Sequence, residues 1–217
     1  MRFSDHQNIE EALLERINEC KVSYPLPSQK LRVGLDIGAN IGGFSVIAHD
    51  RFDKIIAIEA NKDSVDCMFS VLKERNIENI SVFNYAVSDK KNEKVKLYGL
   101  TGDVKNWNHS GNAGTEWGDS TLRERMTEEY DEVETIDLDS VFTLVELDFI
   151  DYMKIDCEGA EFKFLYEKDL SSVGYIVGEF HPGVIGDKVN LLWDHIRKTH
   201  ELQVLDNQCL FYAQLRS

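Results

Sequence analysis

The sequence predicts an α/β fold with a doubly wound, mostly parallel sheet that ends in an antiparallel hairpin. Apolar runs alternate with helical segments along most of the chain, which is typical of parallel strands covered by helices on both faces. A glycine-rich turn follows the first run, and two apolar runs separated by Asp-Asn close the chain. At 217 residues, we expect a single domain over 1–217.

Residues 1–30 are predicted to form an N-terminal helix and a linker. In SDHQNIEEALLERINECK, Ile9, Leu13 and Ile17 recur at four-residue spacing, which indicates an amphipathic helix. We expect its apolar stripe to pack on the main body of the domain. The segment YPLPS then separates this helix from the sheet.

The strands and helices of the sheet follow in alternation. The predicted strands are LRVGLDIG, KIIAIEA and ISVFNYAVS, with helices beginning at GGFSVIAHD and KDSVDCMFSVLKERN. Further along the chain, strands and helices alternate again: the strand DYMKIDCEGAE, a helix from about Phe162, the strand YIVGEFHPG and the helix DKVNLLWDHIRKTH. The C-terminal hairpin is predicted in ELQVLDNQCLFYAQL.

Residues 88–142 interrupt this rhythm and are predicted as an inserted, β-rich substrate or lid segment. EKVKLYGL and EVETIDLDSVF are read as strands with outward polar positions. Between them lies a long loop rich in Gly, Asn and Trp, and such loops inside compact domains are usually functional or disordered. We expect the part around Trp107 and Trp117 to close over a substrate, with a role in covering the core as the alternative.

The net charge disfavours nucleic-acid and membrane partners, and the cysteines indicate the compartment. The formal net charge of −15 repels nucleic-acid backbones and anionic lipid surfaces. The four cysteines are far apart and form no CxxC pair, which favours idle thiols in a reducing compartment. No segment has the apolar length of a signal peptide core or a membrane span. We therefore expect a cytoplasmic protein with no nucleic-acid or membrane partner, whose oligomeric state the sequence leaves open.

The glycine-rich turn LDIGANIGGFS is the first candidate site. Ligands of an open α/β sheet bind at the carboxyl ends of strands, and Gly38 and Gly42 permit close approach there. Glu59 lies about 20 residues beyond the first glycine, where an acid accepts hydrogen bonds from ribose hydroxyls. This arrangement fits any adenosine cofactor, NAD included.

Two residues of the turn favour a cationic cofactor. Asn40 stands where a dinucleotide site needs a second glycine for the pyrophosphate. Asp36 is expected to point towards the ligand, where its carboxylate would repel a pyrophosphate and attract the sulfonium of S-adenosylmethionine. A simple tight turn with an exposed Glu59 is the structural alternative.

A second candidate site lies in MKIDCEGAEF and the strand after it. Asp156 and Glu158 end a strand that should adjoin the glycine turn, whereas Glu161 is expected only to favour the start of a helix. Glu179 and His181 alternate onto one face of the following strand. These acids and the imidazole are candidates for acid–base catalysis. A divalent metal site is an alternative that we do not favour.

The motifs together resemble the FkbM family of S-adenosylmethionine-dependent methyltransferases. Six motifs occur in the family's order and spacing over roughly Leu31 to Phe180. They are LDIGANIGGFS, AIEAN, NYAVSD, DSTL, ETIDLDSVF and MKIDCEGAEF. The resemblance implies a class I methyltransferase (Rossmann-like) fold and O-methylation of sugars, polyketides or other small natural products. Thr121 stands where the family often has a second serine, and EFHPG departs from the usual end of that strand.

Carried over by motif, the resemblance implies the cofactor-binding residues and places Asp156 and Glu158 near the transferred methyl group, whereas His181 is a catalytic candidate from its position in the sequence. The candidate cofactor-binding residues are Asp36, Gly38, Ala39, Asn40, Gly42, Glu59, Ala60, Asn61, Ala86, Val87, Ser120 and Asp156. The candidate catalytic residues are Asp156, Glu158 and His181.

We expect in-line methyl transfer from S-adenosylmethionine to a hydroxyl of a small molecule or sugar. Asp156, Glu158 or His181 would accept the hydroxyl proton, and we favour His181 as the base with Asp156 positioning the acceptor. An NAD-dependent oxidoreductase and a non-catalytic methyltransferase-like binding module are the rival readings.

Overall fold

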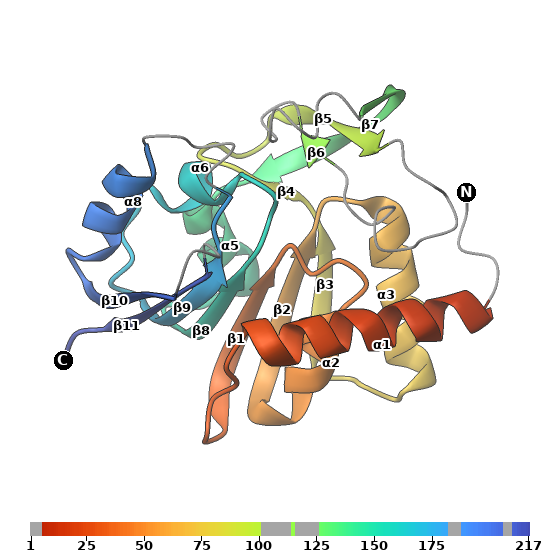
Figure 1. The fold of residues 1–217 in the computed structure, drawn as a ribbon, viewed down its shortest axis with the longest axis horizontal. Coiled ribbons are helices and arrows are strands. Elements are labelled where there is room, and N and C mark those ends of the chain that lie inside the picture. The colour runs from red at the N-terminus through yellow and green to blue at the C-terminus, as the bar shows by residue number, and fades with distance from the viewer. Residues whose placement is uncertain (1–5, 101–113, 116–125, 182–187, 206–209) are drawn as a thin grey trace.

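A computed structural model describes residues 6–100, 114–115, 126–181, 188–205 and 210–217 (Figure 1). Its central sheet has seven strands in the order β10-β11-β9-β8-β1-β2-β3. The strands are β1 (Leu31–Ile37), β2 (Phe52–Glu59), β3 (Ile80–Asn84), β8 (Ile150–Ile155), β9 (Val173–Glu179), β10 (His200–Leu205) and β11 (Leu210–Leu215). The pairs from β9 to β3 are all parallel, while β11 pairs antiparallel with both β9 and β10. The predicted doubly wound sheet and C-terminal hairpin are confirmed.

The order of the strands reverses between β1 and β8. The chain moves from β1 outward to β3, and later from β8 outward to β9 on the other side. Ligands of doubly wound sheets bind at the carboxyl ends of the two strands at such a reversal. Both candidate motifs therefore end at one point of the sheet.

Helices cover both faces of the sheet and enclose two apolar cores. They are α1 (His6–Ser23), α2 (Gly43–Ala48), α3 (Lys62–Glu74), α5 (Leu138–Val145), α6 (Glu161–Leu165) and α8 (Val189–Ile196), with a 3₁₀ turn η1 (His49–Arg51). Residues of α1, α2 and α3 pack with one set of strand side chains, and those of α5, α6 and α8 with the other. Successive side chains of β2 point to opposite faces of the sheet, so Ile55 packs in the core beneath α1, α2 and α3 and Ile56 in the core beneath α5, α6 and α8.

The N-terminal helix is part of the domain, as its apolar stripe predicts. Leu13 and Ile17 are buried in the same core as Phe44 of α2. A Cβ added to Gly43 would lie 2.8 Å from the Cβ of Arg16, so the two helices touch where the glycine turn ends. Figure 1 shows α1 lying across α2 in front of the sheet.

The inserted segment forms a second sheet, in the order β4-β7-β5-β6. Its strands are β4 (Ala86–Val87), β5 (Lys94–Leu100), β6 (Gly114–Thr115) and β7 (Met126–Ile136). In Figure 1 this sheet lies beyond the carboxyl ends of the parallel strands. The β-rich character of the insertion is confirmed, whereas Trp107, Trp117 and most of the predicted long loop lie outside the described residues.

Two element predictions were wrong in detail. The segment ending in Phe142 is a strand only to Ile136, because Asp137 caps a helix by accepting a hydrogen bond from the amide of Ser140. The predicted strand ISVFNYAVS divides at Tyr85 into β3 of the main sheet and β4 of the second sheet.

No helix among the described residues is both long and apolar enough to cross a membrane. The three cysteines in this part of the chain, Cys20, Cys67 and Cys157, are free thiols.

Neighbouring leucines of α1 test whether this helix stabilises the domain. Leu13 is fully buried, whereas Leu14 is 53% exposed. We expect Leu13→Ala to lower the free energy of unfolding by about 2–5 kcal/mol. Leu14→Ala should change it by less than about 0.5 kcal/mol. Urea unfolding of the two variants gives the comparison, and equal effects would mean that α1 does not pack as described.

Candidate functional site

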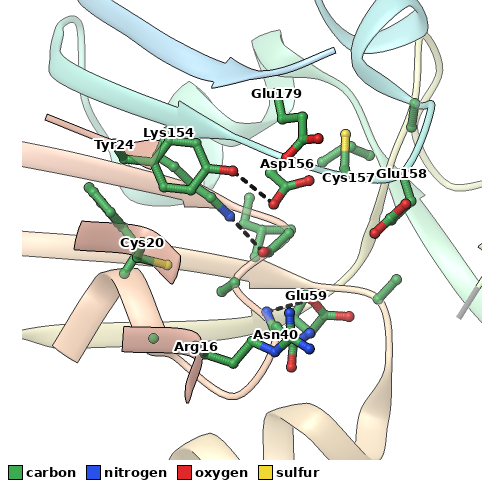
Figure 2. Close-up of a pocket in the computed structure, with 18 of the residues that line it drawn as sticks. Arg16, Cys20, Tyr24, Asn40, Glu59, Lys154, Asp156, Cys157, Glu158 and Glu179 are labelled. Carbon is green, nitrogen blue, oxygen red and sulfur yellow. Dashed lines mark hydrogen bonds between the residues drawn. The ribbon is translucent and has the colours of Figure 1, made fainter. Parts of the chain in front are cut away.

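A cavity of about 380 Å³ lies where β1 and β8 end. Its wall combines the glycine turn after β1, the end of β2, the segment after β8 and the end of β9. Figure 2 shows Glu59 and Asn40 on one side of this cavity and Asp156, Glu158 and Glu179 on another. The two sites predicted from sequence are therefore parts of one cavity.

Backbone contact between Gly38 and Asp156 joins the two halves of the site. Gly38 has a φ of +69°, and a Cβ at this position would lie only 1.7 Å from the carbonyl oxygen of Asp156. The amide of Asp156 also donates to the carbonyl of Ile37, at 3.1 Å. Only glycine permits this conformation and this close approach together.

Asp36 does not face the cavity, and the prediction that its carboxylate meets the ligand was wrong. Leu35 and Ile37 belong to one core, so the alternation of β1 turns Asp36 to the opposite face, beneath α2. There Asp36 is fully buried, and its Oδ2 accepts a hydrogen bond from Ser45 Oγ at 2.6 Å. Its charge is neutralised within the protein and does not select a cationic ligand.

Lys154 supplies the charge that compensates Asp36. The two residues are register partners in neighbouring parallel strands, and Lys154 Nζ lies 3.3 Å from Asp36 Oδ1. The ammonium also donates to the carbonyls of Ile37, at 3.1 Å, and Gly38, at 2.8 Å. Burial alone would lower the pKa of Lys154, but the charges of Asp36 and Asp156, together with the hydrogen bond to Asp36, outweigh it and raise this pKa. By binding these two carbonyls, Lys154 holds the backbone at the start of the glycine turn in place.

Glu59 organises the opposite wall of the cavity, as its position predicts. Its two carboxylate oxygens accept hydrogen bonds from the backbone amides of Asn40, at 2.8 Å, and Asn61, at 2.7 Å. Burial raises the pKa of Glu59, while these two hydrogen bonds act against the shift. Each oxygen keeps a lone pair with which it can accept from a ligand hydroxyl.

Most of the predicted cofactor-binding residues line the cavity. They are Gly38, Ala39, Asn40, Glu59, Ala60, Ala86, Val87 and Asp156.

Besides Asp36, two of the predicted cofactor-binding residues stand behind the cavity wall. Gly42 adopts a φ of +93° at the N-terminus of α2, with its open side towards Met68. Asn61 caps α3 by accepting a hydrogen bond from the amide of Ser64. Ser120 lies outside the described residues.

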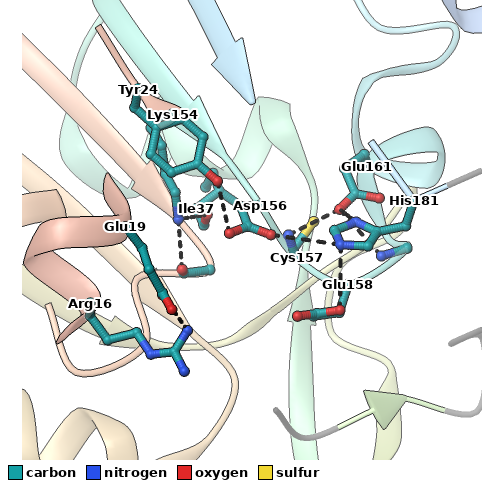
Figure 3. A network of polar contacts seen from close by, with 12 residues as sticks. Arg16, Glu19, Tyr24, Ile37, Lys154, Asp156, Cys157, Glu158, Glu161 and His181 are labelled. Carbon is teal, nitrogen blue, oxygen red and sulfur yellow. Dashed lines mark hydrogen bonds and ion pairs between the residues drawn. The ribbon is translucent and has the colours of Figure 1, made fainter. Parts of the chain in front are cut away.

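The candidate catalytic residues gather around His181. Its Nε2 lies 3.4 Å from Glu158 Oε2 and 4.0 Å from Asp156 Oδ1, while its Nδ1 lies 3.0 Å from Glu161 Oε1 (Figure 3). All three predicted catalytic residues line the cavity. The imidazole thus has a carboxylate at each ring nitrogen.

Glu161 has a larger role than the helix-start function expected from sequence. It is fully buried, and its Oε1 accepts from the amides of Cys157 and Gly159 as well as facing His181. The turn after β8 therefore holds the carboxylate that orients the imidazole. In the sequence, the position of Glu161 three residues after Glu158 is the signal for its contact with His181.

The electrostatics of this group follow from burial and neighbouring charges. Burial raises the pKa of Glu158 to about 7, against the opposing charge of His181. Burial alone would lower the pKa of His181, but the hydrogen bond and charge of Glu161, with further carboxylates nearby, raise it to about 10. Burial and the charge of Asp156 also raise the pKa of Glu179. The surrounding carboxylates therefore favour the protonated form of His181.

The N-terminal helix contributes residues to the site that sequence reasoning missed. Arg16, Glu19, Cys20 and Ser23 line the cavity from α1, and Tyr24 follows them. The hydroxyl of Tyr24 donates to Asp156 Oδ2 at 2.9 Å. Nothing in the sequence pattern links Tyr24 to a carboxylate 132 residues later, because the contact depends on how α1 packs.

Comparison with known proteins identifies the methyltransferase FkbM domain, whose family model matches residues 36–204. The structure of methyltransferase FkbM from Methylobacillus flagellatus KT is similar, with a TM-score of 0.55 and 14% identity over 87% of this chain. This chain covers 44% of the Methylobacillus chain, so it spans less than half of that protein. A search of curated protein sequences finds no match.

Two further solved structures are similar at a lower level. A SAM-dependent methyltransferase from Aquifex aeolicus has a TM-score of 0.47 and 11% identity, over 97% of each chain. TrmK from M. capricolum, solved with S-adenosyl-homocysteine, has a TM-score of 0.45 and 10% identity, over 93% of this chain and 67% of that one.

The buried pair of Asp36 and Lys154 gives a stability prediction. Lys154→Met leaves the Asp36 carboxylate buried without its cation, and we expect a loss of about 3–5 kcal/mol of unfolding free energy. The double variant Asp36→Asn/Lys154→Met should be more stable than Lys154→Met alone. Urea unfolding at neutral pH gives the free energies of the wild type, Asp36→Asn, Lys154→Met and the double variant, and simple additivity of the two single losses would contradict the pairing.

Proposed function

Because this chain belongs to the FkbM family of S-adenosylmethionine-dependent methyltransferases, we propose that it methylates a hydroxyl group of a small molecule or sugar. The observation that carries the proposal is the gathering of Asp156, Glu158 and His181 in the cavity that Glu59 also lines. A hydroxyl must lose its proton when it takes a methyl group, and carboxylates beside the acceptor can receive that proton. The formal net charge of −15 disfavours a nucleic-acid acceptor.

The residues of the cavity fit S-adenosylmethionine, which supplies a methyl group already activated on a sulfonium. Glu59 would hold the ribose hydroxyls, with the backbone around Gly38 close to the ligand. Ala86 and Val87, at the start of the inserted sheet, would border the adenine. The carboxylates of Asp156, Glu158 and Glu179 give the other wall a negative charge, which suits a cationic group.

Among the candidate bases, the geometry favours Glu158 over His181. Both nitrogens of His181 face carboxylates, so its ring is placed to donate on each side. Glu158 lines the cavity and can accept a proton from an acceptor hydroxyl. Asp156 would position the acceptor, itself held by the hydrogen bond from Tyr24. The sequence-based preference for His181 as the base is therefore replaced by Glu158.

Product identification tests the proposed function. The purified chain is incubated with isotope-labelled S-adenosylmethionine and an extract of small metabolites, and labelled products are identified by mass spectrometry. We expect the label on an oxygen of a small molecule or sugar. A label found only on nitrogen, carbon or RNA would contradict the proposal.

Substitutions in the cavity test the assigned roles once an acceptor is known. We expect Glu158→Gln to lower kcat by about 10²–10⁴-fold, because the proton acceptor is lost. Calorimetry should give nearly unchanged affinity for S-adenosylhomocysteine, since Glu158 does not hold the ribose. Glu201→Gln makes the same chemical change at an exposed position outside the cavity and is the matched control.

Two outcomes would contradict these assignments. Normal turnover in the Asp156, Glu158 and His181 variants would remove all three from the catalytic machinery. S-adenosylhomocysteine binding without turnover of any acceptor would favour the non-catalytic binding module.

A further inference from the structure

Three metal-ligating side chains converge where β8 and β9 end. Asp156 directly follows β8, Glu179 is the last residue of β9, and His181 lies two residues further along. Each offers one ligand atom, and these atoms all lie within 4.8 Å of one another. The three residues lie at or just beyond the ends of β8 and β9, which are neighbouring parallel strands, so the sheet brings them together.

We propose that Asp156, Glu179 and His181 bind one divalent metal ion of the Mg²⁺ or Mn²⁺ class beside the methyl-transfer position. Two carboxylates and one imidazole form a donor set that Mn²⁺ accepts, with coordination positions left for water or a substrate. With bonds of about 2.1 Å, adjacent donors of an octahedral ion lie about 3 Å apart and opposite donors about 4 Å apart. Small side-chain rotations bring the three donors from their present spacing to these values.

His181 is already oriented as metal-bound histidines usually are. Such histidines give one ring N–H to a carboxylate, which fixes the ring and turns the other nitrogen to the metal. Nδ1 of His181 lies 3.0 Å from Oε1 of the fully buried Glu161, whereas Nε2 faces Glu158, at 3.4 Å, and Asp156, at 4.0 Å. Metal binding would replace the proton on Nε2. Oε2 of Glu161 is also buried and has no hydrogen-bond partner among the described residues. Glu161, at the start of α6, therefore already holds the His181 ring in place.

Glu179 supplies an independent observation that points to a cation. Asp156 is paired with Tyr24, and Glu158 with His181, but Glu179 makes no hydrogen bond or ion pair with any described residue. Its carboxylate nevertheless lines the cavity and is half-buried close to Asp156. Burial and the charge of Asp156 raise the pKa of Glu179 and outweigh the charges of His181 and Lys154, which lower it. A cation bound between Glu179 and Asp156 would stabilise both carboxylates.

The metal site narrows the class of acceptor, and this step rests on the proposed function. An ion in this position would bind an acceptor through two adjacent oxygens, as in a vicinal diol. The oxygen that takes the methyl group would release its proton to Glu158, while the sulfonium becomes a thioether. Glu158 is outside the ligand set and stays available for this proton.

Binding of Mn²⁺ to the full chain tests the site. After removal of metals with EDTA, the protein is titrated with Mn²⁺, and the signal of the free ion is followed by electron paramagnetic resonance. We expect one ion per chain and at least about tenfold weaker binding in Glu179→Gln. Glu161→Gln should weaken binding by about 10–100-fold, because His181 loses its orienting partner. Glu201→Gln, exposed and outside the cavity, should bind Mn²⁺ as the wild type does.

Binding of S-adenosylhomocysteine to the same variants separates the two proposals. An unchanged circular dichroism spectrum and urea unfolding midpoint in Glu179→Gln show that this variant is folded, so its loss of Mn²⁺ is a loss of ligand. No Mn²⁺ binding by the wild type at millimolar concentration, or equal binding by wild type and Glu179→Gln, overturns the metal site. Failure to bind S-adenosylhomocysteine would instead count against the methyltransferase function, whatever the Mn²⁺ result.

Discussion

The backbone of Gly38 lies against the carbonyl of Asp156, and the arrangement of the site depends on this contact. It joins the turn after β1 to the segment after β8, at the point where the strand order reverses. Lys154 stabilises this contact, because its ammonium donates to two backbone carbonyls, those of Ile37 and Gly38, and forms an ion pair with the buried Asp36. Because the contact is between backbones, the glycine turn after β1 and the carboxylates on the other wall are held at a fixed spacing.

The negative charge of the site comes from the ends of β8 and β9. Asp36, whose position in the motif suggests a ligand contact, is neutralised by Lys154 beneath α2. Asp156, Glu158 and Glu179 face the cavity instead, and His181 and Tyr24 compensate them only in part. The surplus carboxylates suit the cationic cofactor of the family, and they are the basis of the proposed metal site.

Strand ends could be predicted from sequence, whereas contacts between packed elements could not. Glu59, Asp156 and His181 end parallel strands, and such ends meet at one edge of a sheet, so their shared cavity follows from the pattern. The pairing of Asp36 with Lys154 needs the order and register of β1 and β8, which no single segment encodes. Tyr24 reaches Asp156 only because α1 packs on Gly43. The helix after Asp137 was read as a strand because its apolar residues follow directly on those of β7.

A crystal structure of the chain with S-adenosylhomocysteine tests the central claim most directly. The account predicts ribose hydroxyls within hydrogen-bond distance of Glu59 and the sulfur on the side of the cavity formed by Asp156, Glu158 and His181. A ribose placed away from Glu59, or a sulfur directed away from these three residues, would contradict the account of how this cavity transfers a methyl group.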